Sequence, residues 1–363
     1  MKYIFILVCM LSICIQSCDK GDKITEPENI VYSDYNWVKI ATISLPPERA
    51  YHDMAYDSES DRVILFGGDS GPAALRMYSD TWAYDHDSKK WTNMKPSGGP
   101  AAGHAMTYDV ESDRIILFGS SSRGTLYGSD TWAYDFNSNN WTELKPAQKP
   151  PGRFGHNMAY DAESDRIILF GGSISELQPI DDTWSYDFNT NTWTEMNPPA
   201  SPPPRQYHSM AYDLESDQII LFGGGDYTPE SMPEYTIIYD DTWAYDFNSN
   251  TWTQMMPDKY PSARVYTDMT YNEKCDCVIL FGGGTGSFKE AYPSRGYGNE
   301  TWQYDFNSNE WRKINIEKRP SSRKKHKLAY DSESDRIILF GGDEWYLDGN
   351  TSRYQNELWV LEK

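Results

Sequence analysis

Hydrophobic and polar positions follow one pattern that recurs six times along the chain. The phrase reads MAYDSESDRVILFGG at 54–68, MAYDAESDRIILFGG at 158–172 and LAYDSESDRIILFGG at 328–342, with looser copies that begin at Met106, Met210 and Met269. The Gly that closes each apolar run falls at 67, 119, 171, 223, 282 and 341. Spacings of 52 and 59 residues between these glycines predict propeller blades rather than short helical repeats.

Each copy predicts four strands, which we name a to d in chain order. In the first copy we expect them at 49–57, 62–68, 80–85 and 90–95. Short links rich in Asp, Ser and Asn join a to b and c to d, as in hairpin turns. Strand b is apolar without alternation, so we expect both of its faces to be buried between blades. Twelve of the thirteen Trp residues recur in strands c and d, and Trp345 is left over.

The four-strand repeat is offset from the two ends of the chain by one strand. The sixth copy ends after strand c, ELWVLEK, and a spare strand d, NWVKIAT, stands at 36–42 before the first strand a. Because a propeller must hide the edges of its sheets, we predict that this strand completes the last blade. The expected fold is all-β, with six blades over residues 36–363.

The recurring order of Arg, His, an apolar run ending in Gly-Gly, Tyr and then Trp resembles the kelch repeat. The resemblance extends over residues 36–363 and implies a six-bladed kelch β-propeller with strand a innermost. It also implies that the strand-a Arg lies beside the b–c loops at the rim of a central channel. Many kelch proteins are binding modules, and a few, similar to galactose oxidase and the sialate mutarotases, are enzymes. The resemblance therefore implies a fold and leaves the activity open.

The first 17 residues have the pattern of a signal peptide. Lys2 precedes an apolar run, Ile4 to Ile15, that is too short to span a membrane. The IQSC that follows resembles the lipobox of prokaryotic lipoproteins, which implies lipidation of Cys18. Residues 18–35 are polar and suit a flexible tether. We expect an exported protein anchored through Cys18 and facing outside the cytoplasm, with plain secretion or a retained anchor as alternatives.

Charge narrows the range of partners. The chain carries 54 acidic and 33 basic residues and a net charge of −21, which argues against a nucleic-acid ligand. The a–b turns hold over half of this charge. Carboxylates suit calcium, but each tight turn supplies only its own acids, and calcium needs six to eight converging oxygens. We therefore expect the turns to form a solubilising face.

The opposite face begins with a ring of arginines. Five of the six inner strands start with Arg, at Arg49, Arg153, Arg205, Arg264 and Arg323. Such a ring in an acidic protein would attract an anionic ligand through bidentate hydrogen bonds. The alternative is that each Arg pairs with a carboxylate or carbonyl of the next blade.

The b–c loops differ between blades, and those of blades 4 and 5 are longer by seven residues. Variable loops on a rigid scaffold commonly carry function. The loops of blades 4–6 hold aromatic and Arg side chains that suit a protein interface or a sugar ring, namely Tyr235, Tyr239, Tyr292, Arg295, Trp345, Tyr346 and Arg353. We predict that the d–a and b–c loops of blades 4–6 bind a protein or glycan and that the propeller is monomeric. The alternative is that these side chains cover their own blades.

No catalytic or metal site is predicted. Five of the six His occupy one position of strand a, at His52, His104, His156, His208 and His326. Because they belong to separate blades, we expect hydrogen-bonded structural histidines rather than zinc ligands. Cys275 and Cys277, in the a–b turn of blade 5, could chelate a soft metal, but no further ligand is near in sequence, so they read as a local substitution.

The sequence therefore favours a binding protein without a cofactor. It contains no nucleophile–base motif and no phosphate loop. A carbohydrate-active enzyme similar to the sialate mutarotases is one alternative, and a structural module of the cell surface is another.

Overall fold

The computed structural model describes residues 35–42, 44–71, 76–101, 104–120, 128–175, 178–226, 237–285, 296–345 and 352–362, which belong to one compact unit, Tyr32–Lys363. All regular secondary-structure elements in these ranges are β-strands. Among the described residues there is accordingly no helix with the length and hydropathy to cross a membrane. The signal segment and five predicted site residues lie outside them: Cys18, Tyr235, Tyr292, Arg295 and Tyr346.

Six four-stranded antiparallel sheets form the blades. Blade 1 contains β2 (Ala50–Asp57), β3 (Arg62–Asp69), β4 (Thr81–Asp85) and β5 (Lys90–Asn93). Blade 2 contains β6 (Ala105–Asp109), β7 (Arg114–Ser120), β8 (Asp130–Asp135) and β9 (Asn140–Leu144). Blade 3 contains β10 (Asn157–Asp161), β11 (Arg166–Phe170), β12 (Thr183–Asp187) and β13 (Thr192–Glu195). Blade 4 contains β14 (Ser209–Asp213), β15 (Gln218–Phe222), β18 (Thr242–Asp246) and β19 (Thr251–Met255). Blade 5 contains β21 (Asp268–Asn272), β22 (Cys277–Phe281), β25 (Thr301–Asp305) and β26 (Glu310–Ile314). Blade 6 contains β28 (Lys327–Asp331), β29 (Arg336–Phe340), β32 (Leu358–Glu362) and β1 (Asn36–Ile40).

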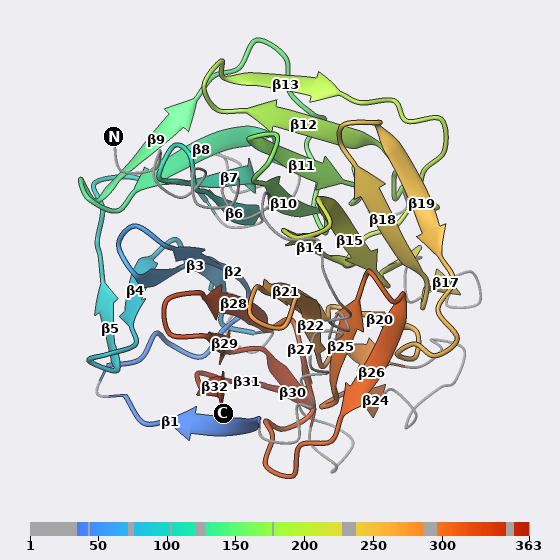
Figure 1. Ribbon diagram of the computed structural model, residues 1–363. Coiled ribbons are helices and arrows are strands. Elements are labelled where there is room, and N and C mark those ends of the chain that lie inside the picture. Colours follow the sequence, from blue (N-terminus) through green and yellow to red (C-terminus); the bar gives the residue numbers. More distant parts are fainter. Residues whose placement is uncertain are drawn as a thin grey trace, which may run out of the picture. The chain divides into compact units, whose positions relative to one another are not determined.

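The blades form a closed ring (Figure 1). Their inner strands contact one another in the cyclic order β2, β6, β10, β14, β21, β28 and back to β2. The fold is therefore the six-bladed all-β propeller that the repeat predicted.

The N-terminal strand completes the last blade, as predicted from the ends of the repeat. β1 pairs antiparallel with β32, from Asn36 opposite Glu362 to Ile40 opposite Leu358. Trp37 is 1% exposed, and its indole Nε1 donates to Thr301 Oγ1 of blade 5 at 2.9 Å. The first and last segments of the propeller thus share one sheet, which ties the ring shut.

Neighbouring blades pack through strand b and through an indole hydrogen bond. Strand b is buried on both faces, and its Ile, Leu and Phe side chains are at most 1% exposed in every blade. Trp141 in strand d of blade 2 donates through Nε1 to Thr81 Oγ1 in strand c of blade 1 at 2.9 Å. Four other blade pairs repeat this bond. Trp91 has no such acceptor, because Leu358 replaces the Thr in blade 6.

The antiparallel order places the two kinds of connection on opposite faces. The a–b and c–d turns end on one face, which we call the turn face, and the d–a and b–c connections end on the other, which we call the loop face. Asn36, the first residue of β1, pairs with Glu362, the last residue of β32. β32 is strand c of blade 6, and in the other blades the end of strand c leads into the c–d turn. The chain therefore enters the propeller on the turn face.

Blades 4–6 carry small additional sheets on the loop face. Their b–c connections begin and end as hairpins: β16 (Gly225–Asp226) with β17 (Ile237–Ile238), β23 (Gly284–Thr285) with β24 (Gly296–Tyr297), and β30 (Asp343–Trp345) with β31 (Ser352–Tyr354). The hairpins of blades 5 and 6 gain a third strand from β20 (Arg264–Val265) and β27 (Arg323–Lys324). Hydrogen-bonded hairpins thus hold the ends of these longer loops close to the inner strands.

Candidate binding site on the loop face

The five strand-a arginines are structural ion-pair residues. Each is 0% exposed. Arg49 binds Asp80 through two parallel hydrogen bonds of 2.8 and 2.9 Å and also donates to the Gly67 carbonyl at 2.8 Å. The other four pair with the acidic residue that precedes their own strand c. Arg153 and Arg205 form the same two bonds, to Asp182 and Asp241. Arg264 and Arg323 make one bond each, to Glu300 and Glu357.

These pairs correspond to the alternative that the sequence left open, except that the partner lies in the same blade rather than the next. The guanidinium groups join the d–a connection to the b–c connection of each blade. Because they are fully buried and occupied by carboxylates, we leave the five arginines out of the binding site.

The residue two positions after each strand-a Arg has an unusual backbone conformation. Tyr51, Tyr207, Tyr266 and Lys325 have φ values of 56°, 59°, 56° and 59°, and Gly155 has a φ of 67° at the equivalent place. Glycine adopts this left-handed conformation freely, whereas other L-residues lose about 1–2 kcal/mol there. Four bulky side chains therefore occupy a position at which Gly would be easier to accommodate.

A belt of backbone hydrogen bonds explains the shared conformation. Tyr207 N donates to the Gly155 carbonyl at 2.7 Å, Tyr266 N to the Tyr207 carbonyl at 3.0 Å and Lys325 N to the Tyr266 carbonyl at 3.0 Å. Tyr51 N continues the series to the Lys325 carbonyl at 3.4 Å. The belt needs the conformation but not the side chains, since Gly155 takes part without one.

The four side chains gather at the centre of the loop face, and we call them the tyrosine–lysine cluster. The rings of Tyr207 and Tyr266 lie 4.0 Å apart, and those of Tyr51 and Tyr266 meet edge to face at 5.8 Å. Lys325 Nζ lies 4.3 Å from the Tyr51 ring and 5.2 Å from the Tyr266 ring, within cation–π range. Burial raises the pKa of the Tyr266 hydroxyl well above its usual value, and Tyr207 and Tyr51 add to the shift.

A cavity of about 390 Å³ lies at this cluster. Besides the four cluster residues, its lining includes Asp69, Met77 and Phe154, the five strand-a histidines and Lys327. Ligand pockets for small molecules and peptide side chains commonly fall in this range of volume. The cluster thus combines strained backbone, aromatic surface and a cation at the mouth of a cavity, which is a combination that functional sites often show.

The strand-a histidines are buried behind this cavity. His156 Nε2 lies 3.2 Å from the Phe118 carbonyl and His326 Nε2 lies 3.1 Å from the Phe281 carbonyl, each in the preceding blade. All five imidazoles also pack against a Phe ring of that blade. Burial lowers the pKa of His156 and of His326 to about 3 and that of His104 to about 4. These are neutral packing residues at five of the six blade junctions, and Thr267 takes the position at the junction of blades 4 and 5.

The described loop residues lie around the cluster rather than in it. The Arg205 guanidinium carbon sits 4.1 Å from the Tyr239 ring, so this Tyr covers a buried ion pair. Arg353 is exposed and pairs with Glu48 at 3.2 Å. Trp345 ends β30, where it pairs with Ser352. Exposed apolar side chains near these loops are Tyr51, Met77, Ile237, Met256 and Tyr260.

Sequence reasoning missed the cluster although the repeat contains a signal for it. The position holds Gly103 and Gly155 in blades 2 and 3 but Tyr or Lys in the other four. A residue that replaces Gly where other copies keep it points to a special role of the side chain. The convergence of the four residues became visible only once the ring was closed.

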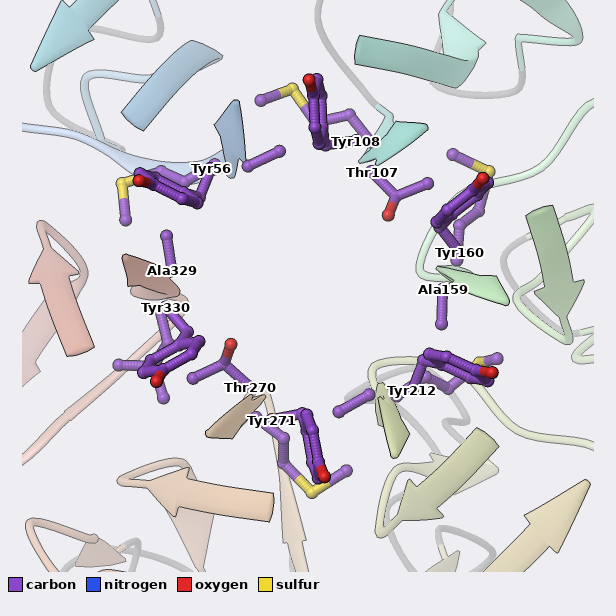
Figure 2. A pocket seen from close by; sticks show the side chains of 18 of the residues that line it. Tyr56, Thr107, Tyr108, Ala159, Tyr160, Tyr212, Thr270, Tyr271, Ala329 and Tyr330 are labelled. Atoms are coloured by element: carbon purple, nitrogen blue, oxygen red, sulfur yellow. The ribbon is translucent and has the colours of Figure 1, made fainter. Parts of the chain in front are cut away.

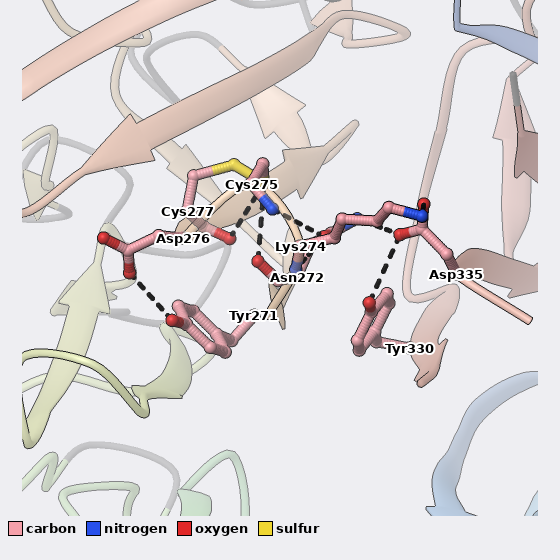
Figure 3. The surroundings of a disulfide bond; sticks show 8 residues. All are labelled: Tyr271, Asn272, Lys274, Cys275, Asp276, Cys277, Tyr330 and Asp335. Carbon is pink, nitrogen blue, oxygen red and sulfur yellow. Dashed lines mark hydrogen bonds and ion pairs between the residues drawn. A yellow bond between two sulfur atoms is a disulfide. The ribbon is translucent and has the colours of Figure 1, made fainter. Parts of the chain in front are cut away.

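Cys275 and Cys277 form a disulfide across the a–b turn of blade 5 (Figure 3). Between them Asp276 has a φ of 49° and accepts a hydrogen bond from the Tyr271 hydroxyl at 2.8 Å. The other five a–b turns form the same Tyr–Asp bond without cysteines. The disulfide joins residues two positions apart, so it constrains the unfolded chain little.

The fold is that of a kelch-type β-propeller. The chain matches the model of the KLHDC2/KLHL20/DRC7 Kelch-repeats domain over residues 29–151 and 145–342. It therefore belongs to this kelch-repeat family. It is 26% identical over 362 aligned residues to the F-box/kelch-repeat protein At1g51550 of Arabidopsis thaliana, covering 88% of this chain and 72% of that protein. It is also 36% identical over 75 residues to Kelch domain-containing protein 2 of Bos taurus, covering 21% of this chain and 18% of that protein.

Proposed function

We propose that this protein is an exported binding propeller that holds a partner protein on its loop face. The tyrosine–lysine cluster is the observation that carries the proposal. Three Tyr and one Lys occupy a strained position that Gly fills in blade 3, so their side chains contribute something that the fold does not need. Tyr and cationic side chains around a pocket are typical anchors of interfaces.

The surroundings of the cluster support a protein as the partner. Met77, Ile237, Met256 and Tyr260 are exposed apolar side chains in the connections of the loop face. They are distributed over several blades, as expected of an extended interface with a central anchor. The predicted region of blades 4–6 is thereby widened to blade 1, which supplies Tyr51 and Met77. A glycan that stacks on the Tyr rings is the second ligand class that the test must separate.

Glycine variants test this proposal without breaking the fold. The double variant Tyr207→Gly and Tyr266→Gly removes two rings and relaxes two strained residues, so the backbone belt should persist as it does at Gly155. We expect a tenfold or greater loss of affinity for a partner captured by the wild-type propeller in crosslinking and on a glycan array. Binding would be measured by surface plasmon resonance, with circular dichroism to show that the variant is folded.

The matched control for this experiment is Leu214→Ala, which removes an exposed apolar side chain from the turn face. Its affinity should equal that of the wild type. Equal binding by the glycine variant and the wild type would contradict the loop-face proposal. Capture on the glycan array alone would replace the protein partner by a glycan.

The tether belongs to the same proposal. β1 begins on the turn face, the side opposite to the cluster, and the proposed tether precedes it in the chain. Replacing Cys18 with Ser should move the protein from the membrane fraction to the soluble exported fraction, because the lipid would be lost. Cell fractionation measures this, and continued membrane association of the variant would contradict the lipid anchor.

A further inference from the structure

The turn face opens into the central channel through a second cavity, of about 520 Å³ (Figure 2). Six Tyr, one from each inner strand, stand around it: Tyr56, Tyr108, Tyr160, Tyr212, Tyr271 and Tyr330. Each hydroxyl donates to an Asp of its own a–b turn at 2.8 to 3.2 Å. The hydroxyl ends are held at the rim, and the rings form an aromatic wall below it.

The channel is apolar and open below the rim. Thr107, Ala159, Thr270 and Ala329 lie between the Tyr rings of neighbouring blades around the open centre (Figure 2). Because these side chains are small, they leave the axis clear, and methionines fill the spaces between the Tyr rings, at Met54, Met106, Met158, Met210 and Met269. The wall therefore suits a slender apolar chain rather than a polar group.

The floor of this cavity carries charge that is not balanced. Lys327 Nζ lies 3.2 Å from an oxygen of Asp53 and 3.2 Å from an oxygen of Asp268. One ammonium thus serves two carboxylates, which are only 4% and 5% exposed. Among the described residues at this level of the other blades, Ala105, Asn157 and Ser209 are uncharged, so the floor has one negative charge left. Burial raises the pKa of Asp268 to about 6, Lys327 opposes the shift, and Asp53 adds to it.

The rim is also anionic. Glu273 lines the cavity. Each a–b turn carries a Glu at or near its tip: Glu59, Glu111, Glu163, Glu215, Glu273 and Glu333. The hydrogen bond between Glu215 and Asp276 raises the pKa of Glu215 to about 7, and the negative charge of Asp276 adds to the shift. Lys274 directly follows Glu273 in the sequence, but its ammonium group already pairs with Asp335 at 3.3 Å. Carboxylates thus lie both above and below an aromatic, low-dielectric wall, which concentrates a field that attracts cations.

We propose that this cavity binds a linear polyamine along the channel axis. One ammonium would neutralise the excess charge at Asp53 and Asp268, the methylene stem would lie against Tyr and Met side chains, and the outer ammonium groups would meet the rim carboxylates. An anion is repelled at both ends, and a neutral apolar chain leaves the buried charge unpaired. A compact divalent metal would need six or more converging oxygens, which the floor does not offer.

The dimensions favour a long polyamine. Five residues of strand separate the floor at Asp53 from the turn at Ser58, which corresponds to about 17 Å of channel. A short diamine can reach only one of the two charged layers, whereas a triamine or tetramine can contact both. The affinity should therefore increase from putrescine through spermidine to spermine by more than the added charge alone produces.

Isothermal titration calorimetry on the full chain at physiological salt tests this site with those three amines. We expect one spermine per propeller. Asp268→Asn should weaken spermine binding at least tenfold, because it removes the excess floor charge while Asp53 still pairs with Lys327. Thr107→Phe should abolish binding by filling the channel without a change of charge, because Thr107 lines the cavity and is only partly buried. Asp87→Asn, which removes one carboxylate from an exposed c–d turn, is the charge-matched control and should bind as the wild type does.

Three results would overturn the polyamine site. The first is equal weakening by Asp268→Asn and Asp87→Asn with no effect of Thr107→Phe, which would indicate general attraction to an acidic surface. The second is absence of binding at physiological salt to the folded wild type. The third is full displacement of spermine by millimolar calcium. If Asp268→Asn does not fold, the uncharged Thr107→Phe variant decides alone. The Tyr207→Gly and Tyr266→Gly variant should bind spermine normally, so failure of this site and failure of the loop-face proposal are distinguishable.

Discussion

Lowering the pH from 7 to 5 is expected to remove most of the folding stability of this propeller. Its five strand-a histidines are neutral in the folded state because burial lowers their pKa, to about 3 for His156 and His326 and to about 4 for His104. In the unfolded chain they titrate near 6.5, so the unfolded state binds more protons as the pH falls. The contribution of these histidines to the free energy of unfolding is therefore complete above pH 6.5. It is lost below this pH, by roughly 2 kcal/mol per histidine between pH 7 and pH 5.

Five such residues amount to about 10 kcal/mol, which is comparable to the whole stability of a typical domain. Asp213 and Asp268 act in the opposite sense. Burial raises the pKa of each to about 6, so they take up protons in the folded state and return about 1 kcal/mol each. The net change remains a large loss, and urea denaturation followed by Trp fluorescence at pH 8, 7, 6 and 5 measures it.

Blade 5 offers a natural control for this prediction. Thr267 stands where the other blades have His, and its hydroxyl donates to the Phe281 carbonyl at 2.9 Å. His208→Thr should lower stability at pH 8 through lost packing but reduce the slope below pH 6 by about 1.4 kcal/mol per pH unit, the contribution of one proton. Equal stability of the wild type at pH 7 and pH 5 would show that the imidazoles are not held neutral.

Deletion of residues 36–42 is expected to unfold the propeller or to lower its melting temperature by more than ten degrees. The deletion removes β1 and Trp37, and it exposes β32 as an unpaired edge. Replacing a fully buried Trp with Ala alone costs about 3–5 kcal/mol, and an open edge adds the tendency to aggregate. Because the ring closes through this strand, the loss should affect every blade in one cooperative transition.

Two single substitutions separate ring closure from a general effect of the terminus. Trp37→Ala should destabilise strongly, since the indole packs 5.3 Å from Phe281 and bonds to Thr301. Val38→Thr, on the same strand but 38% exposed, should change stability by no more than about 0.5 kcal/mol. Differential scanning calorimetry compares them, and a deletion variant that melts like the wild type would contradict closure by β1.

Several features of the site were readable in the sequence only as alternatives. The acidic residue before each strand c is visible as the first letter of DTW, ETW or ELW, and Arg at strand a is equally visible. Their pairing within one blade depends on how the b–c connection returns, which spacing alone does not tell. Cys275 and Cys277 likewise suited a metal or a local substitution, and their disulfide follows from the turn that brings them together.

The sequence by itself determined the number of blades, the order of strands, the burial of strand b and the closure by β1. These properties rest on local periodicity and on the need to hide sheet edges, and both are written in contiguous stretches of chain. Only the tertiary structure decided the two ends of the channel. Tyr51, Tyr207, Tyr266 and Lys325 meet on the loop face because closure of the ring brings residues from four blades to one axis. Two carboxylates share one ammonium at the floor for the same reason, since charge balance at the axis depends on blades that are distant in sequence.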